Sequence, residues 1–276
     1  MGPRRAVFLD VDGTYAHRGV VPTGHVAVVR AARARGHAVL LCTGRPRSML
    51  QPRLLEAGFD GLVAAAGGYV EVGGRVLVDR RFPAELAERT LEVLDSHDVA
   101  YILEAPEVLY GPPGVDERLH DLLRHHLRPA AGDDREGPVD ILDALRMAAD
   151  LSGASFGKVT VFGSPVPVTA LVEAIGPGVG ALPSSIPGMG DSAGEIHLTG
   201  VHKAVGIELV SEHLGIPRRD VIAFGDGMND LEMLTHAGIG VAIVGADPRV
   251  IAAADRTAEG PEAEGLVAAF AELGLV

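Results

Sequence analysis

Two acidic segments, each directly after a short apolar run, constrain the fold of this chain more than any other feature. The apolar run at 6–9 leads into Asp-Val-Asp-Gly-Thr at 10–14, and the run at 221–224 leads into Gly-Asp-Gly-Met-Asn-Asp at 225–230. An apolar run of this length that ends in a turn is typical of a buried parallel strand. Ligands of open α/β sheets bind at the carboxyl ends of the strands, so we expect at least three carboxylates around one crevice.

The rest of the chain alternates expected strands and helices on either side of a middle segment of different texture. Outside that segment, strands are expected at 38–42, 62–65 and 239–243, and helices at 24–35 (capped by Thr23), 47–57, 203–214, 231–237, 248–254 and 266–273. Strands that alternate with helices favour right-handed crossovers and a parallel sheet. We therefore predict an α/β fold with a Rossmann-like, doubly wound parallel sheet as its core.

The middle segment reads as a separate α+β domain inserted into this core. It has expected helices at 83–96, 116–127 and 168–174, strands at 101–104 and 158–162, and loops at 129–138 and 176–194. The predicted domains are accordingly a first core half at 1–81, the inserted domain at 82–195, and a second core half at 196–276.

Composition excludes several classes of function. The net charge of −13 over 276 residues argues against a nucleic-acid partner, since phosphate backbones select basic faces. No apolar run approaches the roughly 20 residues of a membrane span, so no membrane partner is expected. A single cysteine fits a reducing compartment, and the first expected strand begins too early to leave room for a signal peptide. We therefore expect a cytoplasmic protein.

A divalent cation is expected where the two acidic segments meet, because clustered carboxylates repel one another and hard cations prefer oxygen ligands. Asp10 and Asp12 lie two residues apart at the end of a strand, so extended geometry lets both side chains point the same way. One carboxylate can attack phosphorus, and the other can protonate the leaving oxygen and then activate water. The motif by itself fits a solvated turn or a helix cap equally well.

Two further segments carry groups that suit a phosphate. Thr43-Gly44-Arg45 follows the second expected strand and offers a hydroxyl and free backbone amides ahead of a helix, although a plain helix cap explains it too. Lys203, one of only two lysines, begins the helix that leads into the second acidic segment. Its ammonium can hold phosphoryl oxygens and offset the charge of the aspartates, the alternative being an ordinary surface lysine.

In the second acidic segment, Asp226 is the first carboxylate after the strand and is the expected metal ligand there. Asn229 and Asp230 can hold phosphate or metal-bound water, or orient Lys203. A glycine-rich turn with an aspartate cap remains the alternative. The four motifs fall in a consistent order, each at the end or start of an expected core element, which argues against independent coincidences.

These segments together resemble the haloacid dehalogenase superfamily of phosphohydrolases, in its Cof-type branch with a large cap inserted between the second and third motifs. The resembling residues are 8–14, 42–45, 201–204 and 223–234, with 237–242 and 253–255 in the tail. The inserted domain resembles the family's cap in position and length only. Three sites depart from the family pattern: Ala66 and the pair Val244-Gly245 replace asparagine-containing motifs, and Tyr15 replaces the usual leucine after Asp-Gly-Thr.

The resemblance implies a role for each residue. Asp10 would be the nucleophile and Asp12 the general acid and base. Mg²⁺ would be held by the Asp10 side chain, the Asp12 backbone carbonyl and Asp226, with Asn229 and Asp230 in support. Phosphate would be bound by the following residues: Thr43, Gly44, Arg45, Lys203 and Asn229.

The sequence thus predicts a Mg²⁺-dependent hydrolase of phosphomonoesters that acts on a small phosphorylated metabolite, such as a sugar phosphate, through an aspartyl-phosphate. Two alternatives stay open: a phosphotransferase or phosphomutase on the same scaffold, and a phosphometabolite-binding protein without turnover.

Overall fold

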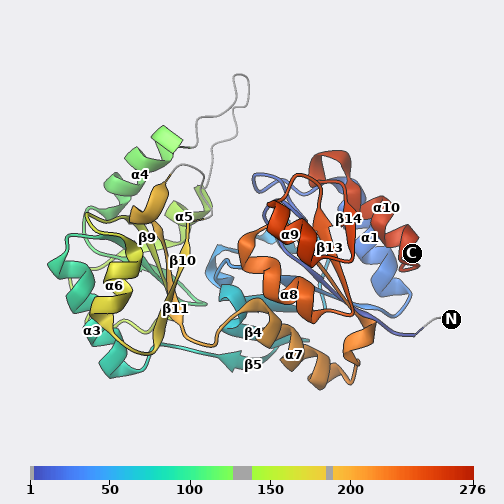
Figure 1. Cartoon of the computed structure of the whole chain (residues 1–276), viewed down its shortest axis with the longest axis horizontal. Coiled ribbons are helices and arrows are strands. Elements are labelled where there is room, and N and C mark those ends of the chain that lie inside the picture. The colour runs from blue at the N-terminus through green and yellow to red at the C-terminus, as the bar shows by residue number, and fades with distance from the viewer. Residues whose placement is uncertain (1–2, 127–138, 185–188) are drawn as a thin grey trace. The chain divides into compact units, whose positions relative to one another are not determined.

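The computed structural model describes residues 3–126, 139–184 and 189–276. The chain divides into two compact units (Figure 1). The first comprises 1–45, 50–79 and 202–276, and the second comprises 46–49 and 80–201. The boundaries predicted from the sequence are 81/82 and 195/196, and the grouping of the short segment 46–49 with the second unit was not predicted.

The first unit is built on an eight-stranded sheet in the order β14-β13-β12-β1-β2-β3-β4-β5. The strands are β1 Ala6–Leu9, β2 Ala38–Cys42, β3 Gly61–Ala64, β4 Tyr69–Val72, β5 Arg75–Asp79, β12 Val221–Gly225, β13 Ile239–Ile243 and β14 Arg256–Ala258. Neighbours from β14 to β3 pair in parallel, and β4 and β5 are antiparallel. Strand β1 lies between β12 and β2 with every residue buried, which explains its uninterrupted apolar sequence.

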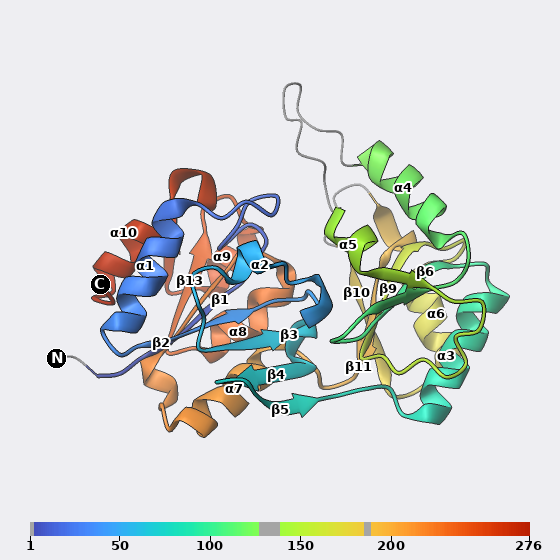
Figure 2. The same cartoon turned by 180° about the vertical axis from the view of Figure 1, so that it is seen from behind.

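Helices cover both faces of this sheet, as its alternating side chains require. They are α1 Thr23–Ala34, α2 Pro52–Leu55, α7 Lys203–Leu214, α8 Leu231–His236, α9 Pro248–Ala253 and α10 Gly265–Glu272. One apolar core joins Val7 and Leu9 of β1 to α1 and α10, and the other joins Phe8 to α7 and α8 (Figure 2). The predicted doubly wound α/β core is confirmed.

The second unit is an α+β domain with a six-stranded sheet in the order β10-β11-β9-β6-β7-β8. The strands are β6 Ala100–Glu104, β7 Leu109–Gly111, β8 Leu145–Met147, β9 Lys158–Gly163, β10 Val179–Pro183 and β11 Gly194–Leu198, and the helices are α3 Ala84–Ser96, α4 Val115–His126, α5 Val139–Ala144 and α6 Val168–Ile175. Helices α3 and α6 pack on one face of the sheet through a shared apolar core.

Three local expectations differ from the structure. The helix expected at 47–57 is instead a 3₁₀ turn at 47–49 and the short helix α2, because Pro52 can start a helix but cannot continue one. Thr23 lies inside α1, whose cap is Pro22. The loop expected at 176–194 contains β10, which forms by antiparallel pairing with β11 although it contains Gly180 and Pro183. The loop expected at 129–138 falls outside the described residues.

Among the described residues, every helix falls short of the length and hydropathy that a membrane crossing would require.

Candidate active site

The two acidic segments lie side by side because the strands before them are neighbours. Strands β1 and β12 pair in parallel with Leu9 opposite Phe224, and the Asp10 N–H continues the ladder by donating to the Phe224 carbonyl at 3.0 Å. Carboxylate oxygens of Asp10, Asp226 and Asp230 consequently lie within 4.8 Å of one another. The convergence of Asp10 and Asp226 expected from the sequence is present.

Lys203 bridges two of these three carboxylates. It is the first residue of α7 and is completely buried. Its Nζ donates to Asp10 Oδ1 and to Asp230 Oδ1, both at 2.5 Å. A surface position for this lysine is thereby excluded, and its positive charge offsets part of the repulsion among the three carboxylates.

Asp230 organises the turn that carries Asp226. Its Oδ2 accepts the backbone N–H groups of Asp226 at 3.0 Å and Gly227 at 2.8 Å, while its Oδ1 accepts from Lys203. With both oxygens engaged and its side chain fully buried, Asp230 is less available to an ion than Asp10 or Asp226. Of the two roles left open for it, orientation of Lys203 matches these bonds.

Thr14 links the two acidic segments, a contact that the sequence analysis did not anticipate. Its hydroxyl donates to Asp226 Oδ1 at 2.8 Å. The turn before it needs glycine, because Gly13 has φ +87° and a Cβ there would lie 2.3 Å from Asp226 Oδ2. Thr14 is part of the Asp-Gly-Thr motif, so the sequence marks the residue, but it does not show that Asp226 is its hydrogen-bond partner.

Burial governs the protonation of these groups. It raises the pKa of Asp10 well above its usual value, with the Lys203 ammonium opposing. Burial and the nearby Asp230 charge raise the pKa of Asp226 to about 6, against the Thr14 hydrogen bond. Burial also disfavours charge on Lys203, but the carboxylates of Asp10 and Asp230 outweigh it and raise the pKa of the ammonium. The site therefore favours a bound cation that would stabilise its carboxylates.

The Asp12 side chain forms an ion pair with Arg45 and is not part of the group formed by the Asp10, Asp226 and Asp230 carboxylates. The Arg45 Nε and Nη2 groups donate to the two oxygens of Asp12, each at 2.7 Å, in a bidentate pair. The Asp12 side chain is about half exposed, and that of Arg45 is largely covered. This pairing was not predicted from the sequence, where Arg45 was expected to bind phosphate.

The remaining predicted phosphate residues lie at the ends of β2 and β12. Thr43 is buried, and its hydroxyl accepts the Arg45 backbone N–H at 3.1 Å. A Cβ built at Gly44 would lie 3.3 Å from Asn229 Nδ2, so these two segments adjoin. Asn229 itself lies in a 3₁₀ turn at the start of α8. All five predicted phosphate residues therefore lie in the first unit: three follow β2, one follows β12, and Lys203 begins α7.

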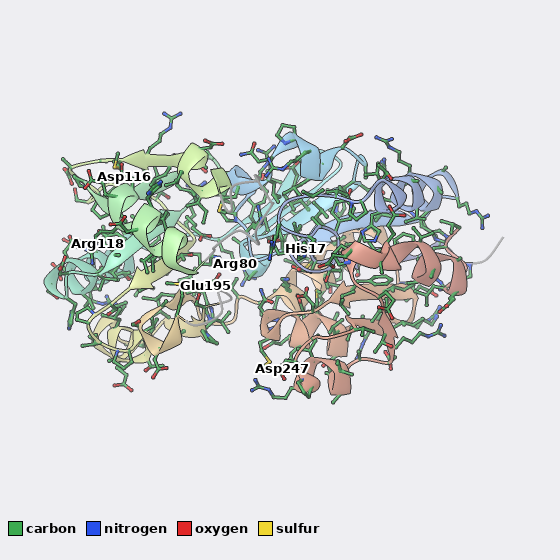
Figure 3. All side chains as sticks on the ribbon, turned by 90° about the horizontal axis from the view of Figure 1, so that it is seen from above. His17, Arg80, Asp116, Arg118, Glu195 and Asp247 are labelled. Atoms are coloured by element: carbon green, nitrogen blue, oxygen red, sulfur yellow. The ribbon has the colours of Figure 1, made fainter. Side chains whose placement is uncertain are left out.

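A pocket lies beside Asp226 within the first unit. It is lined by Gly13, His17, Gly245 and Glu262 among others. His17 (Figure 3) lies 3.0 Å from Glu262 through its Nδ1. Neither residue was singled out from the sequence, and neither belongs to a motif that would have identified it.

Comparison with known proteins places the chain in a family. A model of the haloacid dehalogenase-like hydrolases matches residues 7–270. The chain belongs to this family. "Putative phosphatase YkrA" of Bacillus subtilis (strain 168) is 27% identical over 277 residues, which cover 99% of this chain and 98% of that protein.

Two further relatives extend the comparison of this haloacid dehalogenase-like hydrolase. The 5-amino-6-(5-phospho-D-ribitylamino)uracil phosphatase YitU of Bacillus subtilis (strain 168) is 46% identical over 72 residues, 26% of this chain and 27% of that protein. A solved structure of a hypothetical protein from Geobacillus kaustophilus HTA426 has a TM-score of 0.83 at 25% identity and covers 99% of this chain and 100% of that chain. The predicted family and fold are confirmed, as is the predicted enzyme class, a phosphatase.

Proposed function

We propose that this hydrolase cleaves phosphomonoesters of small metabolites in two steps, with Asp10 as the nucleophile and Mg²⁺ as its cofactor. The observation that carries the proposal is the meeting of Asp10, Asp226 and Asp230 around the buried Lys203. Nothing in a purely structural ion pair requires three carboxylates for one ammonium. The excess negative charge suits a divalent cation.

The donor set fits Mg²⁺. Asp10 and Asp226 each offer a carboxylate oxygen, and hard oxygen donors are the ligands that this ion prefers. We assign these two side chains and the Asp12 backbone carbonyl as ligands, with Asp230 and Asn229 in support. When bound, the ion would neutralise charge on the phosphoryl group and on the Asp10 carboxylate.

In the first step an Asp10 carboxylate oxygen forms a bond to phosphorus, and the bond from phosphorus to the leaving oxygen breaks. Asp12, protonated, gives its proton to that leaving oxygen. In the second step water attacks the aspartyl-phosphate, and Asp12, now a carboxylate, takes the proton from the water. The Asp10–phosphorus bond breaks, releasing inorganic phosphate and restoring both aspartates.

Lys203 and the strand-end groups would hold the phosphoryl oxygens. The Lys203 ammonium already lies 2.5 Å from the proposed nucleophile, and the Thr43 hydroxyl and the Gly44 and Asn229 groups come from the adjoining junctions. We expect Arg45 to exchange partners when a phosphoryl group binds, because it donates two of its five N–H groups to Asp12. The same exchange would free Asp12 for proton transfer.

The substrate class is proposed from the relatives. YitU is named for a phosphate ester on a ribityl chain. A polyol or sugar phosphate of comparable size is our proposed substrate for this chain. A panel of phosphorylated sugars and sugar alcohols, ranked by kcat/KM, tests this choice, and a preference for nucleotides or for phosphoproteins would contradict it.

The overall proposal is tested by incubating the protein with p-nitrophenyl phosphate with and without Mg²⁺ and measuring p-nitrophenol and inorganic phosphate. A hydrolase releases both in equal amounts. A phosphotransferase releases p-nitrophenol in excess when a polyol acceptor is added, since the phosphate moves to the acceptor. A non-catalytic binding protein releases neither, an outcome that would overturn the proposal.

Replacing Asp12 by Asn is expected to lower kcat by roughly 10²-fold or more, because the amide can neither protonate the leaving oxygen nor deprotonate water. Mg²⁺ affinity should stay within about threefold of the unchanged protein, since the proposed ligand is the Asp12 backbone carbonyl. Calorimetric titration with Mg²⁺ and steady-state kinetics give the two quantities. Near-normal turnover would remove Asp12 from its proposed role.

Mg²⁺ binding is expected to weaken as the pH falls through 6. Asp226 has a pKa raised to about 6 and Asp10 has a pKa raised well above its usual value, so below pH 6 the ion must displace at least one proton, and the affinity should drop by at least about tenfold per pH unit. Calorimetric titrations between pH 5 and 8 measure this profile.

Thr14→Val provides the matched variant for that profile. The Thr14 hydroxyl lowers the pKa of Asp226, so its loss should move the fall in affinity to higher pH. A profile that is flat from pH 5 to 7, or one that Thr14→Val leaves in place, would contradict the assignment of Asp226 as a ligand.

A further inference from the structure

A buried histidine outside the proposed reaction touches the loop that carries both proposed catalytic aspartates. His25, on α1, is completely buried. Its Nδ1 lies 2.9 Å from the Tyr15 carbonyl oxygen, and its Nε2 lies 3.2 Å from the Leu266 backbone nitrogen at the start of α10. One imidazole therefore joins the loop 10–16 to two packed helices.

The two partners determine the form of the ring. The Leu266 N–H can only donate, so Nε2 must be its unprotonated acceptor. The Tyr15 carbonyl can only accept, so Nδ1 must carry the hydrogen. Burial lowers the pKa of His25, although the bond to Tyr15 and the nearby Glu264 oppose this effect. All three observations agree on a neutral imidazole with its hydrogen on Nδ1.

The backbone of Tyr15 is hydrogen-bonded to the start of the loop 10–16. The Tyr15 N–H donates to the carbonyls of Asp10 and Val11, both at 3.1 Å, and the Ala16 N–H donates to Val11 at 2.8 Å. The residue before Tyr15, Thr14, donates a hydrogen bond to Asp226 through its hydroxyl. Fixing the Tyr15 carbonyl thus restrains the backbone that positions Asp10 and Thr14.

The packing of the Tyr15 side chain would fix the position of this residue less firmly than the hydrogen bond to its carbonyl does. The Tyr15 ring stacks on His25 with centroids 6.2 Å apart and meets Phe59 edge-on at 5.2 Å. Its buried hydroxyl, however, has no hydrogen-bond partner within the described ranges. The directional bonds of this residue are therefore those of its backbone, and its carbonyl is bonded by His25.

We propose that His25, as the Nδ1–H tautomer, is a positioning residue that holds the loop 10–16 in its working geometry through the Tyr15 carbonyl. The proposal rests on the proposed function, because that function assigns Asp10 and Asp12 to the reaction. His25 contacts no reacting group, so it should influence kcat through the placement of Asp10 and leave the binding of a small substrate unchanged.

Two near-isosteric variants separate its two hydrogen bonds. In His25→Asn the side-chain amide can reach the place of Nδ1 and keep the bond to Tyr15, but it loses the acceptor for Leu266. In His25→Gln the amide can reach the place of Nε2 and accept from Leu266, but it loses the bond to Tyr15. We expect kcat on p-nitrophenyl phosphate to stay within about threefold in His25→Asn and to fall about tenfold or more in His25→Gln, with KM unchanged in both.

The melting temperature of His25→Gln should equal or exceed that of His25→Asn, although its kcat is lower. A merely structural role would lower kcat and the melting temperature together. His37→Asn and His37→Gln are the matched controls, because His37 also accepts a backbone N–H, from Arg5, at 3.1 Å. These control variants should leave kcat unchanged. Equal kcat for the two His25 variants, or kcat values that track their melting temperatures, would overturn the proposal.

Two measurements on the intact protein are independent of turnover. Nitrogen-15 spectra of the imidazole at neutral pH should show the Nδ1–H tautomer for His25, and an Nε2–H tautomer or an imidazolium would overturn the assignment. Amide hydrogen exchange at Tyr15 and Ala16 should accelerate in His25→Gln and not in His25→Asn. If the protein proves to have no phosphatase activity, these two results still decide whether His25 holds the loop.

Discussion

Replacing Asp10 by Asn is expected to abolish phosphate release from p-nitrophenyl phosphate, with kcat lower by roughly 10³-fold or more. An amide is not a nucleophile towards phosphorus, so no aspartyl-phosphate can form. The amide oxygen can still accept from Lys203, whose second partner, Asp230, is untouched. The fold should therefore survive, and steady-state kinetics with a thermal melt separate loss of chemistry from loss of structure.

A phosphate mimic sharpens this test. Beryllium fluoride should bind the unchanged protein with Mg²⁺ as an acyl-phosphate analogue on Asp10, and it should fail to bind Asp10→Asn. Asp98→Asn is the control for loss of one carboxylate, because the Asp98 side chain is highly exposed and pairs with Arg118, far from the proposed chemistry in the sequence and in the other unit. Retained turnover in Asp10→Asn, with the control unaffected, would remove Asp10 from the nucleophilic role.

Much of the site could be predicted because parallel strands bring distant residues to one edge. Asp10 and Asp226 are far apart in sequence, but each is the first carboxylate after a fully buried strand, and β1 and β12 turned out to be neighbours. Lys203 was predictable for a related reason, since it begins the helix that leads into β12. In each case the position depends on strand direction, which follows from the alternation of strands and helices along the sequence.

Contacts made by long side chains could not be predicted in this way. The pairing of Arg45 with Asp12 and the contact of His17 with Glu262 depend on rotamers and on loop paths that leave no periodic signal. Strand β10 was missed for a different reason. Its sequence, which contains Gly180 and Pro183 and follows a Gly-Pro-Gly segment, is typical of a loop, and it becomes a strand because β11 supplies an antiparallel partner.

The second unit contains a buried charge cluster that none of the proposed chemistry uses. Lys158 on β9 lies 3.1 Å from Glu104 on β6 and 3.0 Å from Glu195 on β11, and Thr160 also donates to Glu104. The side chains of Lys158 and Glu104 are 3% and 7% exposed. Burial raises the pKa of Glu104, with Lys158 opposing, so the carboxylate depends on the ammonium to remain charged.

Replacing Lys158 by Met is expected to lower the free energy of unfolding of the second unit by about 3–5 kcal/mol at pH 8, because it leaves a buried carboxylate without its counter-ion. Chemical denaturation of the full chain, followed by a probe placed in the second unit, measures the loss. Arg118→Met is the control: the pair of Arg118 with Asp98 is exposed, so its loss should cost about 0–1 kcal/mol.

The destabilisation caused by Lys158→Met should depend on pH, and a second substitution at Glu104 should partly reverse it. Without Lys158, the folded state should take up a proton on Glu104 at a higher pH than the unfolded state does, so the variant becomes more stable as the pH falls and its deficit narrows towards pH 5. Lys158→Met combined with Glu104→Gln should recover part of the loss at pH 8, since it removes the uncompensated charge. A deficit that does not change with pH, together with no recovery in the double variant, would mean that lost packing of the lysine stem, and not the buried carboxylate, accounts for the destabilisation.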